Sequence, residues 1–75
     1  MPPRDRTQDL RYRAEDRYAS YQRELKDLLN EAEGLSHRGL WDEAALKLNS
    51  CLMTLGAMSG VARELNVLYL IAEER

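Results

Sequence analysis

The stretch SHRGLWDEA (residues 36–44) decides the fold, because it reads as a tight corner between two helices. Gly39 is suited to the left-handed backbone conformation that often ends a helix. Asp42 and Glu43 then fall in the first turn of a following helix, where carboxylates offset the partial positive charge of the helix N-terminus. We expect Trp41 to close the end of the seam between the two helices.

The residues before the corner predict one long amphipathic helix, from about residue 7 to residue 37. Apolar residues recur there at steps of three and four, which is the spacing of a helix that packs along one stripe. Charged residues fill the other faces, and no comparable run follows the strand period of two. The predicted stripe consists of Leu10, Ala14, Tyr18, Tyr21, Leu25, Leu28, Ala32 and Leu35.

The residues after the corner repeat this pattern and predict a second helix, from about residue 42 to residue 73. Gly56 and Gly60 lower the helix propensity but keep the phase of the stripe, which favours one long helix over two short ones. The predicted second stripe consists of Trp41, Ala44, Leu48, Cys51, Leu55, Met58, Ala62, Leu65, Tyr69 and Ala72.

Two helices of matched length with a short turn at residues 38–41 predict an all-α, antiparallel two-helix hairpin with coiled-coil-like packing. The hairpin accounts for residues 7–75 as one domain. Residues 1–6 are expected to form a disordered arm, because Pro2 and Pro3 cannot donate helical hydrogen bonds. At 75 residues the core is small, so we expect a partner or oligomerisation to complete the fold.

Composition excludes several classes of function. One cysteine and one histidine supply neither an internal disulfide nor a zinc site. We find no candidate catalytic, cofactor-binding or metal-binding residues, and expect a protein that is not an enzyme. The chain has no secretory signal and no apolar run long enough to span a bilayer, so we expect a cytoplasmic protein with no membrane partner.

Charge argues against a nucleic-acid partner. The formal net charge is −2, with acidic and basic residues intermixed. The arginines of the first arm, interleaved with tyrosines, leave a nucleic-acid-binding hairpin open as an alternative, but neighbouring acidic residues nearly cancel them. We interpret this arm as a solvated helix surface laced with ion pairs.

The second arm carries more apolar residues than one stripe can bury, and this surplus predicts a protein-binding surface. From residue 67 to residue 72 the sequence is apolar on nearly every side of a helix. Two glycines four residues apart add a smooth strip where another backbone could approach closely. The predicted partner-binding residues are Leu52, Met53, Gly56, Gly60, Val61, Val67, Leu68, Leu70 and Ile71.

Residues 25–56 resemble a single tetratricopeptide (TPR) motif. The matching positions are the corner glycine, an aromatic residue two positions later, acidic residues next, and small and bulky residues at the expected steps. Three positions depart from the motif, namely Leu28, Glu31 and Gly56, and no second copy follows in the chain. The matching residues are Ala32, Leu35, Gly39, Trp41, Asp42, Glu43, Ala44, Leu48 and Cys51.

In size, hairpin architecture and its Arg38-Gly39 turn, the chain also resembles the small helical-hairpin co-chaperones of type III secretion needle subunits. That resemblance implies a cytoplasmic subunit that pairs with a TPR-fold partner, and together with it holds the needle subunit unpolymerised.

Two hypotheses of function follow from the sequence. The first is a non-enzymatic co-chaperone or adaptor that binds a helical protein partner, with the needle co-chaperone as its most concrete form. The alternative is a self-assembling structural or adaptor protein, in which two copies form a homodimeric four-helix bundle with no client.

Overall fold

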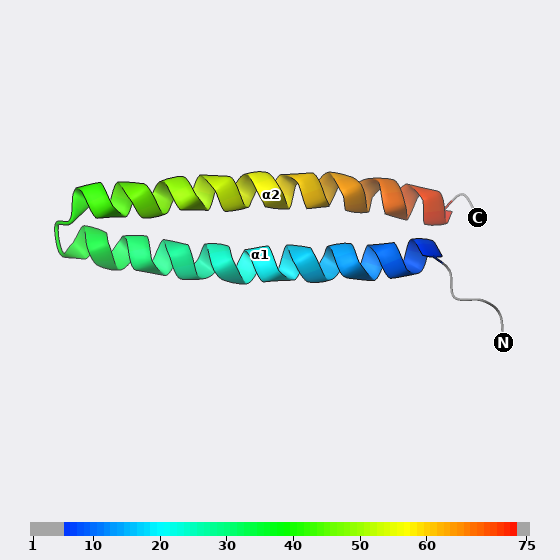
Figure 1. Cartoon of the computed structure of the whole chain (residues 1–75), viewed down its shortest axis with the longest axis horizontal. Helices are drawn as coiled ribbons and strands as arrows, with labels where there is room; N and C mark the ends of the chain where they lie inside the picture. The colour runs from blue at the N-terminus through cyan, green and yellow to red at the C-terminus, as the bar shows by residue number, and fades with distance from the viewer. Residues whose placement is uncertain (1–5, 74–75) are drawn as a thin grey trace.

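The computed structural model describes residues 6–73, which form two long helices. Helix α1 spans Arg6–His37, and helix α2 spans Trp41–Glu73 without interruption at its two internal glycines. The helices run side by side in opposite directions (Figure 1), which confirms the predicted all-α antiparallel hairpin. The molecule measures 59 × 21 × 13 Å. The predicted disordered arm lies outside the described residues, except for Arg6, which opens α1.

The corner has the hydrogen bonds of a Schellman motif. Gly39 has a φ of 75°, which confirms its predicted left-handed conformation. The Leu40 N–H donates to the Leu35 carbonyl at 2.9 Å, and the Gly39 N–H donates to the Ser36 carbonyl at 3.0 Å. These bonds satisfy carbonyls at the end of α1 that the helix itself leaves free. The Leu40 carbonyl accepts the Ala44 N–H at 3.0 Å, so α2 starts immediately.

The predicted stripe of α1 is confirmed from Ala14 to Leu35, where every member is buried or half-buried. It is wrong at Leu10, which is 42% exposed. Arg11 is half-buried in its place. From Ala14 onward the seam residues are separated by alternating steps of four and three, so the preceding seam position lies three residues before Ala14, at Arg11.

The seam of α2 differs from its predicted stripe at every second position. One predicted row is buried or half-buried against α1, namely Ala44, Cys51, Met58 and Leu65. The other row is exposed, namely Trp41, Leu48, Leu55, Ala62 and Tyr69, as is Ala72 near the free end. The positions one residue earlier take its place in the seam, namely Lys47, Thr54, Val61 and Leu68.

Trp41 does not close the seam, since it is 66% exposed. It lies seven residues before Leu48 and belongs to the same exposed row. The exposed row is apolar or aromatic throughout, whereas the row in the seam contains Lys47 and Thr54 beside two apolar residues, so apolar burial alone does not account for how α2 is rotated against α1.

Polar contacts across the seam accompany that rotation. The Lys47 Nζ lies 2.9 Å from Glu31 Oε2. Arg17 Nη2 donates to both Glu64 carboxylate oxygens, at 3.0 and 2.8 Å. Glu31 and Arg17 lie beside the seam of α1, and in the observed rotation Lys47 and Glu64 of α2 reach them. In the same rotation Leu48 and Leu55 are exposed.

Candidate protein-binding surface

Helix α2 carries most of the exposed apolar surface. Among the described residues thirteen large apolar or aromatic side chains are exposed, and ten of them belong to α2. Met53 is 79% exposed, and Leu46 and Leu52 are each 66% exposed. A helix that is apolar on all sides is normally covered on all sides. The hairpin covers only the side of α2 that faces α1, so its exposed surface indicates a protein partner or self-association.

The exposed residues of α2 form two stripes that run parallel to the seam. Moving one residue along a helix turns the side chain by about 100°. The side stripe lies one residue after the seam positions and continues the exposed row that begins at Trp41. From residue 45 to residue 69 it consists of Ala45, Leu48, Leu52, Leu55, Ser59, Ala62, Asn66 and Tyr69. The back stripe lies two residues after them and consists of Leu46, Asn49, Met53, Gly56, Gly60, Arg63, Val67 and Leu70.

The same positions of α1 are polar. The stripe of α1 that lies two residues after its seam contains no large apolar side chain. The outer side of α1 is therefore well solvated by water, whereas the apolar side chains on the outer side of α2 would be more stable against another protein. This polar stripe consists of Asp9, Arg13, Asp16, Ser20, Arg23, Asp27, Asn30, Gly34 and His37.

The structure divides the predicted partner-binding residues between the surface and the core. Those on the back stripe are exposed, namely Met53, Gly56, Gly60, Val67 and Leu70. Leu52 is exposed on the side stripe, and Ile71 is exposed nearby. Their binding role stays a prediction. Val61 and Leu68 are 6% and 8% exposed and pack in one cluster with Ala14. They belong to the hairpin's own core, so their placement on the surface was wrong.

Sequence reasoning placed several surface residues in the seam. Leu48, Leu55 and Tyr69 are 45–46% exposed and extend the apolar surface onto the side stripe. The signal that could have found them lies in α1. Its charged residues at positions 15, 17 and 31 flank the seam, and in the observed rotation of α2 each of them has a polar partner.

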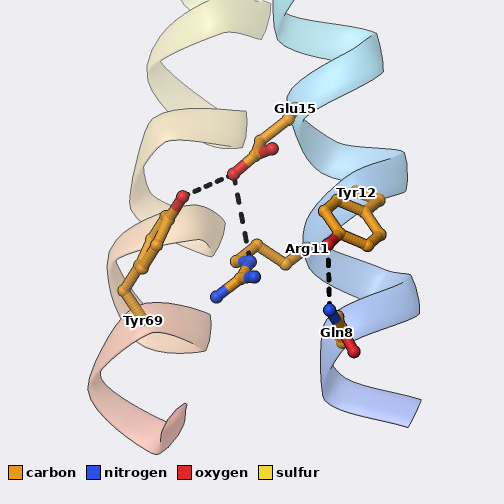
Figure 2. A network of polar contacts seen from close by, with 5 residues as sticks. All are labelled: Gln8, Arg11, Tyr12, Glu15 and Tyr69. Atoms are coloured by element: carbon orange, nitrogen blue, oxygen red, sulfur yellow. Dashed lines mark hydrogen bonds and ion pairs between the residues drawn. The ribbon is translucent and has the colours of Figure 1, made fainter. Parts of the chain in front are cut away.

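A polar network joins the two helices near their free ends (Figure 2). The Tyr69 hydroxyl donates to Glu15 Oε1 at 2.5 Å. The guanidinium of Arg11 lies 5.0 Å from the centre of the Tyr69 ring and 5.5 Å from that of Tyr12. Arg11 Nε lies 4.0 Å from the same Glu15 oxygen. An arginine in the seam thus lies against two aromatic rings and near one carboxylate, while its buried Nε makes no hydrogen bond among the described residues.

The pKa of Tyr69 is raised above its ordinary value of 10.0, first by the hydrogen bond to Glu15 and then by partial removal from water. A group whose pKa is raised by folding stabilises the fold below its unfolded pKa and loses that effect as the pH passes the folded value. We therefore expect Tyr69→Phe to lower the melting temperature at pH 7. The gap to the wild type should close as the pH rises beyond 10 through the raised pKa.

Thermal unfolding followed by circular dichroism between pH 7 and pH 12 measures this gap. Tyr12→Phe is the matched control, because the Tyr12 hydroxyl accepts a bond from Gln8 in the same helix, at 2.9 Å, and not from α2 over residues 41–73. This control should keep the alkaline loss of the wild type. A gap for Tyr69→Phe that stays constant with pH would contradict the assignment.

The cysteine, the possible metal ligands and the hollow near the corner show no arrangement typical of a reactive or binding site. Cys51 is a free thiol buried in the seam, where it packs as a small apolar side chain. Within residues 6–73, no three His, Cys, Asp or Glu side chains are grouped to hold a metal ion. A shallow hollow near the corner is lined by Arg38 and Lys47, and Lys47 is paired with Glu31 there.

Comparisons leave the hairpin without an assigned family: no family model, no curated protein and no solved structure matches the chain. Neither helix, over residues 6–73, has a stretch long and apolar enough to cross a membrane. The fold and its surface define an antiparallel helical hairpin in which one helix carries most of the exposed apolar side chains.

Proposed function

We propose that the chain is a non-enzymatic protein-binding subunit, in which α2 becomes an inner helix of a larger helical assembly. The observation that carries this proposal is the back stripe of α2, which lies opposite α1 and is exposed along its whole length. Between Lys47 and Arg63 the helix has no charged residue, so the exposure of this largely apolar segment to water is unfavourable. An apolar helical partner is the neighbour that its chemistry favours.

The glycines of the back stripe support a helix as the partner. An added Cβ at Gly56 or Gly60 would meet nothing within 4 Å, so neither glycine is needed for contact within the hairpin. Each nevertheless costs helix stability of about 1 kcal/mol relative to alanine. Two such residues four positions apart leave a smooth strip on which another helix backbone can approach closely. Met53 and Val67 flank this strip as apolar anchors.

The most concrete form of this proposal comes from the sequence resemblances. In that form the chain is a cytoplasmic co-chaperone that pairs with a TPR-fold partner and keeps a type III secretion needle subunit soluble. The hairpin supports it in one respect, since the exposed apolar side chains of α2 suit a protein neighbour. The polar α1 then faces water in the complex.

Co-expression tests this form directly. The untagged chain is produced with the TPR-fold co-chaperone and the needle subunit of the same genome, and complexes are separated by size-exclusion chromatography. We expect the three chains to elute together, and Met53→Lys to reduce recovery of the complex at least tenfold. Asn30→Lys, which adds the same charge to the exposed outer side of α1, should leave recovery unchanged.

Two results would count against the proposal. A needle subunit that polymerises regardless of the chain would remove the co-chaperone form. Equal recovery with Met53→Lys and Asn30→Lys would remove the back stripe as the binding surface, whichever partner is used. Circular dichroism of both variants establishes that the hairpin itself remains folded.

A further inference from the structure

The side stripe of α2 has a pattern of its own, distinct from that of the back stripe. None of its eight residues is charged, and all eight are exposed. The half near the corner carries large side chains, at Leu48, Leu52 and Leu55. The half toward the free end carries small or polar ones, at Ser59, Ala62 and Asn66, and ends on Tyr69. The stripe is about 36 Å long, from 24 rises of 1.5 Å each.

This distribution of side-chain sizes favours an antiparallel neighbouring helix, along which large and small side chains follow each other in the reverse order. Antiparallel helices pack in layers that pair positions with a constant sum of residue numbers. When a copy of the same stripe is laid against it in opposite direction, one register pairs all eight positions. Every layer then joins one large and one small or shorter side chain, so the two helices keep an even separation. The layers are Leu55 with Ser59, Leu52 with Ala62, Leu48 with Asn66, and Tyr69 with Ala45.

Other arrangements of two copies fit less well. A parallel pair would set leucine against leucine near the corner and small residues against each other further on, so the helices would have to splay. An antiparallel pair shifted by one heptad toward the corner would set Trp41 opposite Asn66, but it would join two alanines in one layer and two leucines in another. A shift in the other direction would leave Ala45 and Leu48 without a layer of the stripe. Of these registers, only the one centred between Leu55 and Ser59 joins a large with a smaller side chain in every layer.

We propose that two copies of the chain associate through the side stripe, with their α2 helices antiparallel and centred between Leu55 and Ser59. Such an interface is isologous, since each copy contributes the same residues. Around α2, the neighbours then stand about 100° apart: α1 on the seam, the second copy on the side stripe, and a free back stripe beyond. The inference does not rest on the proposed partner, because it uses a different stripe.

Light scattering coupled to chromatography gives the first test, with the full chain. We expect a mass of twice 8.7 kDa at 100 µM. Leu55→Lys, in the central layer, should return the mass to that of one chain while circular dichroism stays helical. Met53→Lys, on the back stripe, should keep the dimer. A wild-type chain that is monomeric at this concentration would overturn the proposal, and so would a dimer that survives Leu55→Lys.

Cross-linking tests the register. In a Cys51→Ala background, Leu52→Cys and Ala62→Cys variants are oxidised separately and as a mixture. The proposed register sets position 52 opposite position 62 of the second copy. Two copies of position 52 then lie about 15 Å apart, which is beyond the roughly 7 Å limit for a disulfide. We expect cross-linked dimer only in the mixture. Efficient cross-linking of Leu52→Cys alone would indicate a parallel pair and overturn the register.

The two tests separate this inference from the proposed function. A monomeric chain that still binds a partner through Met53 would remove the dimer and keep the function. A dimer broken by Leu55→Lys, with no effect of Met53→Lys on any partner, would do the reverse.

Discussion

Val61→Asp is expected to unfold the hairpin, whereas Gly60→Asp, one residue earlier, is expected to leave it folded. Val61 is 6% exposed and belongs to the cluster that contains Ala14 and Leu68. A carboxylate placed there without a partner costs about 3–5 kcal/mol. A chain of 75 residues has a total stability of roughly 4–11 kcal/mol, and a hairpin with a single seam lies toward the low end.

Gly60 provides a closely matched control. It lies in the middle of the same helix, on the exposed back stripe, and an added Cβ there would meet nothing within 4 Å. Aspartate also has a slightly better helix propensity than glycine. The free energy of unfolding, measured with urea at one fixed chain concentration, should therefore fall steeply for Val61→Asp and change by less than about 0.5 kcal/mol for Gly60→Asp. Similar losses in both variants would contradict the observed rotation of α2.

The second large effect is expected at the corner. Gly39→Ala should destabilise the hairpin by about 1–2 kcal/mol, because an L-residue with a side chain is strained at a φ of 75°. An added Cβ at Gly39 would meet nothing within 4 Å, so this cost comes from the backbone conformation and not from crowding. Fixed-concentration urea unfolding measures it directly.

Gly34→Ala makes the same chemical change five residues earlier and should have the opposite sign. Gly34 lies inside α1 in ordinary helical conformation, again with open space around its Cβ position. Alanine there should stabilise the helix by about 0.4–1 kcal/mol. If both variants shift stability in the same direction, the left-handed corner is not what distinguishes them.

The sequence was enough to predict the hairpin, because its strongest signals are local. Gly39 marks the corner through its tolerance of positive φ, and acidic residues mark the start of α2. The stripe of α1 could be predicted because α1 has polar residues on every other side. One rotation of such a helix buries most of its apolar residues, and the structure has that rotation from Ala14 onward, with Leu29 left exposed.

The rotation of α2 could not be predicted in the same way. Toward the free end, adjacent apolar residues such as Val61 and Ala62 support two seams equally. Near the corner, Leu48 and Leu55 give the predicted stripe more periodic support than Lys47 and Thr54 give the observed seam. The observed seam brings together residues that are distant in the sequence, such as Arg17 with Glu64, and periodicity carries no information about such contacts. For the same reason, sequence reasoning located the surplus apolar surface on α2 but did not place its individual residues in separate stripes.

The cross-helix contacts also have a consequence for the order in which the hairpin closes. Lys47 and Glu31 are 16 residues apart, whereas Arg17 and Glu64 are 47 residues apart and Glu15 and Tyr69 are 54. Loop-closure entropy rises with the length of chain enclosed. The contacts between the helices should therefore form from the corner outward. The free ends of the helices should open first and exchange their amide hydrogens fastest.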